Sequence, residues 1–242
     1  MNEMIGVMEP RRLYLQIADR IRQLIRDGHF PAGSRLPAER ELALLLGVSR
    51  PSLREALIAL EIAGNVEVRM GSGIYATAEP EERPNILGGS MGESPLEIIQ
   101  ARSVIEGSAI VLACHQMSSE ALERLRANLD AMQAQISLSR KAIELDRQFH
   151  LIIAEQTGNS VVTRMVRDLF DERHKPLTAQ MRTRFETDDT WLLAFEEHEK
   201  IYAALEAKDP FMAQAAMRMH LDMSKQRWME NEPLRSEREV EI

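Results

Sequence analysis

Apolar residues recur every three to four positions along most of the chain, which predicts a mainly α-helical protein. The first such segment covers residues 12–27 and ends at Gly28, a residue type that closes helices readily. Beyond residue 95 the same period predicts helices at 95–116, 119–137, 139–157, 159–185, 188–207 and 210–230. Pro176 interrupts the fourth of these, so we expect a kink near Arg173. The segments together predict an all-α bundle of six to seven helices.

Two short helices separated by Gly47 are predicted between residues 37 and 60. Ser49 is suited to cap the second helix, and Pro51 is tolerated in its first turn. The apolar stripes of the two helices are Leu42, Leu45 and Leu46, then Leu53, Leu57 and Leu60. The second helix is expected to point Arg50, Ser52 and Arg54 outward. This pattern is typical of a helix-turn-helix whose second helix enters the DNA major groove, although an ordinary helical hairpin with a solvated basic face would share it.

The residues that follow favour the DNA-binding interpretation. Val66 and Val68 alternate with Glu67 and Arg69, and the turn Gly71-Ser72-Gly73 leads into Ile74-Tyr75, which predicts a β-hairpin. A hairpin directly after a recognition helix is a wing. Its small tip and Arg69 could approach a phosphate or the minor groove closely.

A change of composition separates this region from the helical remainder. Residues 79–94 are rich in proline, glycine and glutamate, which is typical of a linker. We therefore expect a winged helix-turn-helix domain at 10–78, a linker at 79–94 and an all-helical domain at 95–231.

Charge and cysteine content narrow the classes of function. The formal charge of −8 lies wholly in residues 80–242, and the basic residues of the first 79 positions are all arginine. Contact with DNA must therefore be local and led by arginine, which matches guanine edges and phosphates. The lone Cys114 excludes a disulfide within the chain and a Cys-rich zinc module, and is expected to be buried. Without a signal-peptide pattern or a membrane-spanning apolar run, we expect a cytoplasmic protein.

Polar residues with metal-binding chemistry interrupt the helical domain. Asp146 and His150 are four residues apart, a spacing that suits one ion, although a hydrogen bond on a helix surface is the commoner explanation. His198 and His220 each lie near the apolar stripe of their own helix, where a single histidine is more often a core or interface residue. An Asp-His-His-His set would suit zinc, nickel, manganese or iron.

Arg102 and Glu106 also lie one helical turn apart. They could form a surface ion pair of a few tenths of a kcal/mol. Alternatively, Arg102 could point into the bundle and bind a carboxylate through two hydrogen bonds.

These motifs resemble the GntR transcription regulators with a FadR-type effector domain, called FCD. The resemblance rests on LPAERELALLLGVSRPSLREAL, the wing GSG, Arg102 with Glu106, and Asp146, His150, His198 and His220. It implies that these last four residues bind a divalent transition metal, with zinc as the expected ion and nickel, manganese or iron as alternatives. It further implies that Arg102 binds a small carboxylate effector (a sugar acid, hydroxy acid or keto acid). A homodimer is expected to bind a palindromic operator and to act as a repressor of a catabolic operon. The DNA-contacting residues implied are Arg35, Arg40, Ser49, Arg50, Ser52, Arg54, Met70 and Gly71.

Two other functions fit part of this pattern. A metal sensor would use the ion itself as the signal. A metal-dependent hydrolase would activate water at the open coordination positions. No obvious general base accompanies the ligands and an enzyme would not need a winged helix, so we expect that the chain is not an enzyme.

Overall fold

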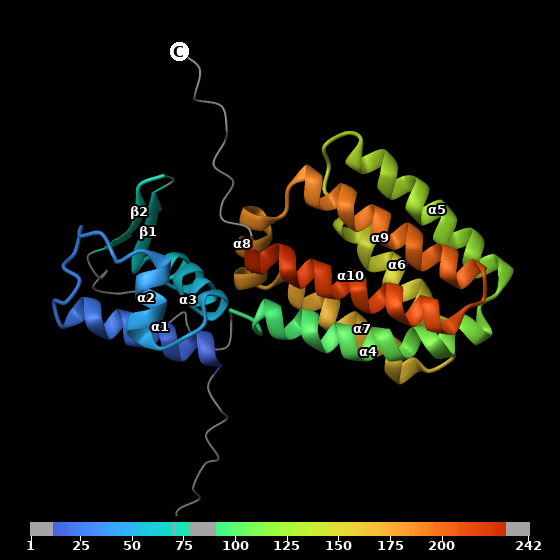
Figure 1. Cartoon of the computed structure of the whole chain (residues 1–242), viewed down its shortest axis with the longest axis horizontal. Helices are drawn as coiled ribbons and strands as arrows, with labels where there is room; N and C mark the ends of the chain where they lie inside the picture. Colours follow the sequence, from blue (N-terminus) through green and yellow to red (C-terminus); the bar gives the residue numbers. More distant parts are fainter. Residues whose placement is uncertain (1–11, 70, 78–90, 231–242) are drawn as a thin grey trace, which may run out of the picture. The chain divides into compact units, whose positions relative to one another are not determined.

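The computed structural model describes residues 12–69, 71–77 and 91–230, which contain ten α-helices and one two-stranded hairpin (Figure 1). The predicted fold class, mainly α with a small hairpin near the N-terminus, is confirmed. None of the helices in the described residues is long and apolar enough to cross a membrane.

The described residues divide into two compact units. The first runs to Ser94 and includes Lys175–Met181; the second comprises Pro95–His174 and the chain from Arg182 onward. In the first unit α1 packs on α3, and α2 precedes α3. Its elements are α1 (Leu13–Arg26), α2 (Glu39–Leu46), α3 (Arg50–Ile62), β1 (Val66–Arg69) and β2 (Gly73–Ala76).

Local chemistry explains the turn between α2 and α3. Gly47 adopts the left-handed conformation with φ of 67°, which a glycine reaches without a steric penalty. The Ser49 side chain accepts a hydrogen bond from the backbone N–H of Ser52 and so caps α3. The antiparallel strands then pair Val66 with Ala76 and Arg69 with Gly73. The predicted helix-turn-helix and wing are thus both present.

The expectation that Leu45 belongs to the buried face of α2 is wrong. Leu42 is fully buried and Ala43 nearly so, whereas Leu45 is 65% exposed. The buried face of this short helix follows Leu42, Ala43 and the half-buried Leu46, and Leu45 falls beside that face rather than within it. In a helix of eight residues with this many leucines, the sequence alone does not show which leucines face the core.

The linker expected at 79–94 lies mostly outside the described residues, but its last four residues are described. Met91 is fully buried, and Tyr14 donates a hydrogen bond of 2.8 Å to the carbonyl oxygen of Gly92. Ser94 donates to Glu55 of α3 at 2.7 Å. The segment just before α4 is therefore fixed to α1 and α3 within the first unit.

The remaining helices match the predicted ranges closely, except that one predicted helix is divided into two. The long helix expected at 159–185 is two helices, separated by a 3₁₀ turn at Glu172–His174. The kink expected near Arg173 is thus a full break, because Pro176 lacks the N–H that would continue the helix. The helices are α4 (Pro95–Gln116), α5 (Ser119–Ile136), α6 (Ile143–Glu155), α7 (Ser160–Asp171), α8 (Pro176–Phe185), α9 (Asp188–Glu206) and α10 (Pro210–Glu230).

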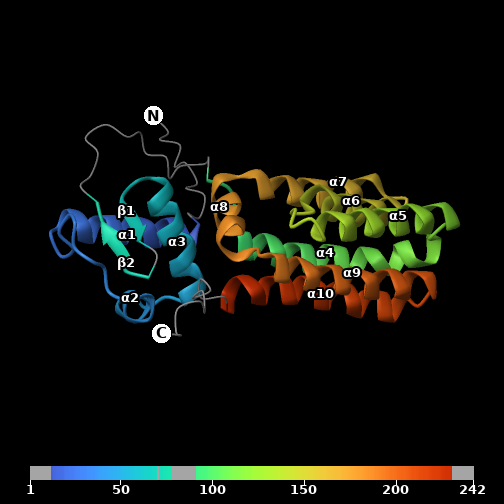
Figure 2. The same ribbon diagram turned by 90° about the horizontal axis from the view of Figure 1, so that it is seen from above.

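In the second unit, α10 packs against both α4 and α9 (Figures 1 and 2). The approach of α4 and α10 is close at Gly107, where an added Cβ would lie 2.7 Å from Cγ of Arg218. Gln214 also donates a hydrogen bond of 2.9 Å to the carbonyl oxygen of Gly107. The opposite side of α9 packs on α5, and α6 packs on α5, α7 and α4. Side chains from α4, α6, α9 and α10 can therefore meet inside this bundle.

Candidate functional site

Four buried side chains meet in the interior of the second unit. Asp146 and His150 come from α6, His198 from α9 and His220 from α10, and each offers one ligand atom within 4.8 Å of the others. The Nε2 atoms of His150 and His198 are 3.3 Å apart, and Oδ1 of Asp146 lies 3.2 Å from Nε2 of His198. The structure thus brings together the set expected from the sequence, while its role as a metal site stays a prediction.

Aromatic rings enclose the imidazoles of this Asp/His cluster. The ring of Phe149 meets that of His198 edge-on, with centroids 4.7 Å apart. The ring centroids of Phe170 and His150 are 5.2 Å apart. Burial lowers the pKa of His150, and burial together with the nearby His198 lowers the pKa of His220 to about 3. At neutral pH these two imidazoles are uncharged, so each has a nitrogen lone pair to offer an ion.

Asp146 forms a buried ion pair with Arg173, in the 3₁₀ turn after α7. Burial alone would raise the pKa of Asp146, but Arg173 and the imidazoles outweigh it and hold the pKa well below its usual value. Arg173 also reaches Oε1 of Glu186 at 3.5 Å, and burial raises the pKa of that glutamate. The sequence indicated a kink at Arg173 but gave no sign of its partner.

Arg102 and Glu106 form a buried pair on α4, with Nε and Oε1 2.7 Å apart and side chains only 7% and 4% exposed. The surface ion pair considered from the sequence is therefore wrong. The Arg102 guanidinium lies 3.8 Å from the centre of the Phe170 ring, and its Nη2 is buried without a hydrogen-bond partner among the described residues. Burial alone would raise the pKa of Glu106, but Arg102 and then His150 lower it to about 2.

A second glutamate lies against His220. Oε2 of Glu197, on α9, is 2.8 Å from Nδ1 of His220, and the carboxylate accepts two hydrogen bonds from Arg227 at 2.6 and 3.0 Å. Burial alone would raise the pKa of Glu197, but hydrogen bonds from His220 and Arg227 lower it to about 2. Sequence reasoning missed Glu197 and Arg227, although the run Glu196-Glu197-His198 placed carboxylates beside a candidate ligand.

The donor set can be tested against the ion that the resemblance implies. The ionised Asp146 and the uncharged imidazoles of His150 and His220 are the protonation states in which these residues bind metals. Carboxylate and imidazole ligands suit zinc and other divalent transition metals. The residues present therefore fit such an ion.

The first unit carries the residues predicted to contact DNA. Arg35, Arg40 and Arg50 are exposed. Ser49 and Gly71 are also exposed, Ser52 is half-buried, and Met70 lies outside the described residues. The exposed arginines are available to phosphates or base edges, as the prediction requires, but their contacts with DNA stay predictions.

The expectation that Arg54 points outward is wrong. Its side chain is only 5% exposed, and its Nε donates a hydrogen bond of 2.8 Å to Oε2 of Glu39 on α2. Arg54 lies on the side of α3 that α2 covers, and Glu39 compensates the buried charge. A pattern that counts arginine as a solvated residue cannot detect such a pair.

Arg35 is held against the wing. A Cβ on Gly73, whose φ is 119°, would lie 2.5 Å from Nε of Arg35, so any larger residue at position 73 would displace the arginine from this position. Arg69 stacks over Tyr75 at 4.2 Å and donates to Glu67. The wing therefore presents two oriented arginines.

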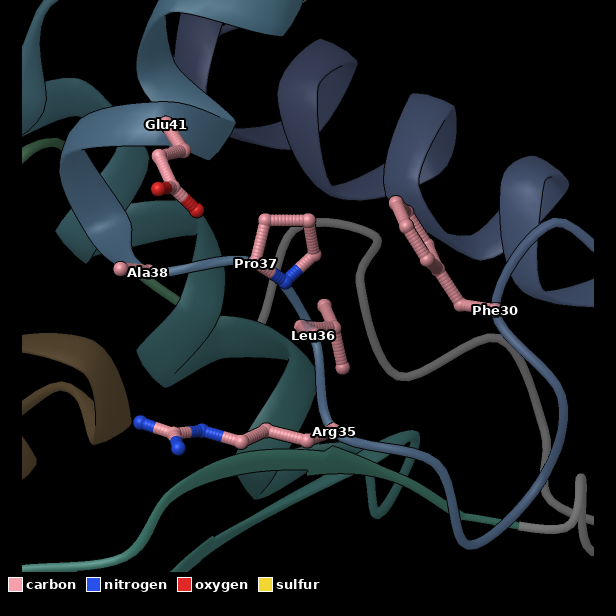
Figure 3. Close-up of a pocket in the computed structure, with 6 residues that line it drawn as sticks. All are labelled: Phe30, Arg35, Leu36, Pro37, Ala38 and Glu41. Carbon is pink, nitrogen blue, oxygen red and sulfur yellow. The ribbon is translucent and has the colours of Figure 1, made fainter.

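Figure 3 shows a pocket in the first unit, at the turn that leads into α2. Arg35 and Glu41 lie on opposite sides of Leu36 and Pro37, with Phe30 at one edge. The pocket contains one predicted DNA-contacting residue and none of the Asp/His cluster.

A helix-turn-helix with a wing, followed by a separate helical unit, is the architecture of a DNA-binding regulator with a second, all-helical domain. The chain belongs to the GntR family of FadR type: the model for "Bacterial regulatory proteins, gntR family" matches residues 13–76, and the FCD domain model matches residues 97–223. The predicted family is confirmed.

Known relatives extend this assignment over most of the chain. The Exu regulon transcriptional regulator of Escherichia coli K12 is 35% identical, covering 90% of this chain and 85% of that protein. The Uxu operon transcriptional regulator of the same organism is 36% identical, covering 91% and 88%. These proteins are transcription regulators and not enzymes, so the expectation that the chain is not an enzyme is confirmed.

The solved structure of E. coli McbR/YncC is 22% identical, with a TM-score of 0.51 over 89% of this chain and 96% of that one. It supports the fold alone.

Proposed function

We propose that this DNA-binding regulator represses a catabolic operon and responds to a small carboxylate bound beside a divalent metal. The observation that carries the proposal is the buried cluster of Asp146, His150, His198 and His220, which is linked to the buried guanidinium of Arg102 through Glu106. A bound ion would supply an electrophilic coordination position for one carboxylate oxygen. Arg102 would donate from its unpartnered Nη2 to the same carboxylate.

The first unit would bind a palindromic operator as a homodimer in the cytoplasm. In this arrangement the two α3 helices enter successive major grooves about one helical turn apart. Arg40, Ser49, Arg50 and Ser52 would contact DNA from α2 and the start of α3, and Arg35 would contact phosphate. An effector that binds one dimer geometry better than another would then change operator affinity.

Metal content tests the proposal most directly. We expect about one equivalent of a transition metal per chain in the purified wild type by elemental analysis, and its loss in His198→Ala. His115→Ala, which changes an exposed histidine, is the matched control and should retain the metal. Absence of metal in the wild type, even after reconstitution with Zn²⁺, Ni²⁺, Mn²⁺ and Fe²⁺, would refute the metal site.

The effector is tested next by thermal shift with a panel of sugar acids, hydroxy acids and keto acids. We expect one class to raise the Tm of the metal-loaded protein, and Arg102→Met to abolish the shift. If metal alone changes operator affinity and no acid does so, the protein is a metal sensor instead.

A further inference from the structure

The three histidines of the Asp/His cluster differ in how the nitrogen remote from the cluster is held. Nδ1 of His198 is buried without a hydrogen-bond partner among the described residues. Nδ1 of His150 lies 2.5 Å from Oε2 of Glu106, but the pair is not aligned as a hydrogen bond. Nδ1 of His220 is hydrogen-bonded to Oε2 of Glu197 at 2.8 Å. His220 is thus the one with an aligned carboxylate partner.

The Glu197 carboxylate is itself fixed from the other side. Arg227 donates to both oxygens of Glu197, and its Nη2 also donates to Oγ of Ser224. The side chains are largely enclosed, with His220 4% exposed and both Glu197 and Arg227 12% exposed. A two-pronged guanidinium–carboxylate contact fixes the plane of the carboxylate as well as its position.

The hairpin of α9 and α10 brings these residues together. The two helices are joined by the short turn at residues 207–209 and pack along each other (Figure 1). Glu197 and His220 lie at similar distances before and after that turn, so they face each other across the pair. Arg227 lies about two turns beyond His220 on α10 and reaches the same carboxylate.

We propose that Glu197, held by Arg227, is a positioning residue that keeps His220 in the tautomer protonated on Nδ1. A carboxylate accepts hydrogen bonds and cannot donate them, so the nitrogen it touches must carry the proton. Nε2 of His220 is then the nitrogen left with a lone pair for an ion. Metal-binding histidines commonly have their second nitrogen held by such an acceptor, whose removal lowers metal affinity about 10–100-fold.

This inference rests on the proposed metal site, but the tautomer can be read without any metal. Long-range ¹H–¹⁵N spectra of the full-length, chelator-stripped protein, labelled at its histidines, distinguish the two tautomers directly. We expect His220 to be protonated on Nδ1 in the wild type and to lose that preference in Glu197→Met. A wild-type His220 protonated on Nε2, or an unchanged tautomer in Glu197→Met, would overturn the proposal.

Zn²⁺ affinity, measured by competition with a chelating dye, supplies the second measurement. We expect Glu197→Met to weaken Zn²⁺ binding about 10–100-fold. Wild-type affinity in this variant would contradict a positioning role. If the wild type itself binds no Zn²⁺, the proposed metal site fails, whereas the tautomer spectra still decide the role of Glu197.

The chain offers a matched control on the same helix. Glu199 accepts two hydrogen bonds from Arg126, as Glu197 does from Arg227, but its side chain is 34% exposed and touches no histidine of the cluster. Glu199→Met should therefore leave both the His220 tautomer and the Zn²⁺ affinity unchanged. An equal loss of affinity in this control would show that helix stability, rather than Glu197, is responsible.

A conservative variant keeps the proposal testable if Glu197→Met does not fold. Glu197→Gln retains the length of the side chain and one oxygen acceptor but loses the charge. We expect the tautomer protonated on Nδ1 to persist, with Zn²⁺ affinity weakened several-fold. A folded Glu197→Gln protein in which His220 is protonated on Nε2 would overturn the proposal.

Discussion

The exposed arginines of the first unit and the buried polar cluster of the second differ in burial, and therefore in how much each should contribute to stability. Arg40 and Arg50 lie at the surface, where they contribute little to a core. His198 and Asp146 are 0% and 5% exposed, so their polar atoms depend on other protein groups or a bound ion rather than on bulk water. We expect substitutions of the first kind to weaken DNA binding without loss of stability. We expect substitutions of the second kind to change ligand binding and stability together, because each buried residue also holds a partner in place.

The largest expected effect lies in the buried cluster. Asp146→Ala leaves the guanidinium of Arg173 buried beside an incomplete set of charges, and we expect a loss of about 3–5 kcal/mol in the free energy of unfolding. Urea denaturation of the chelator-treated protein measures this loss without a contribution from metal. Asp130→Ala, which removes a 66% exposed carboxylate beside Arg126, should cost less than about 1 kcal/mol. Equal effects would remove the distinction between buried and exposed charges.

The close approach of α4 and α10 predicts the next effect. Gly107→Ala would place a Cβ 2.7 Å from Cγ of Arg218 on α10, so either the Arg218 side chain must change its rotamer or the helices must separate. We expect a loss of about 1–3 kcal/mol in unfolding free energy, as is usual for overpacking. Ser108→Ala, at the adjacent exposed position, is the control and should be close to neutral. A stable Gly107→Ala protein would show that the Arg218 side chain or the two helices adjust freely.

Arg54 lies between the two kinds of residue. Arg54→Ala removes the partner of Glu39, so we expect about 1 kcal/mol of lost stability, and a loss of operator affinity smaller than that of Arg50→Ala, because the buried Arg54 can act on DNA only by supporting α2 against α3. Fluorescence anisotropy on an operator selected from random DNA measures the affinity, and urea denaturation measures the stability. A loss of operator affinity as large as that of Arg50→Ala would contradict this indirect role.

Arg50 should behave as a purely functional residue. Arg50→Ala is expected to cost about 1–3 kcal/mol of operator affinity because it removes an exposed guanidinium at the start of α3. Its unfolding free energy should stay within about 0.5 kcal/mol of the wild type. Wild-type affinity in Arg50→Ala would refute the proposed docking of α3.

The smallest effect is expected at Leu45. Because this side chain is 65% exposed, Leu45→Ser should change the unfolding free energy by no more than about 0.5 kcal/mol. Leu42→Ser, at a fully buried position in the same helix, provides the contrast and should cost several times more. Similar losses in both variants would mean that Leu45 is covered in solution.

Much of the fold was predictable because its signals are local. Helical periodicity, the Gly47 turn and the Ser49 cap each depend on residues close together in the sequence. The Asp/His cluster was predicted as a set through the resemblance to FCD domains, because each histidine alone is equally compatible with a packed helical core. Arg173 and Glu197 were not, because each acts through a partner on another helix and a charged residue ordinarily indicates a solvated surface.

The distribution of the cluster over α6, α9 and α10 has a consequence for how the second unit opens. An ion held by Asp146, His150, His198 and His220 would tie residue 146 to residue 220 and close a long loop of chain. Local opening of any one of the three helices would then require release of a ligand. The metal-loaded protein should therefore show slower amide hydrogen exchange in all three helices at once, so that segments distant in sequence exchange as a single cooperative block.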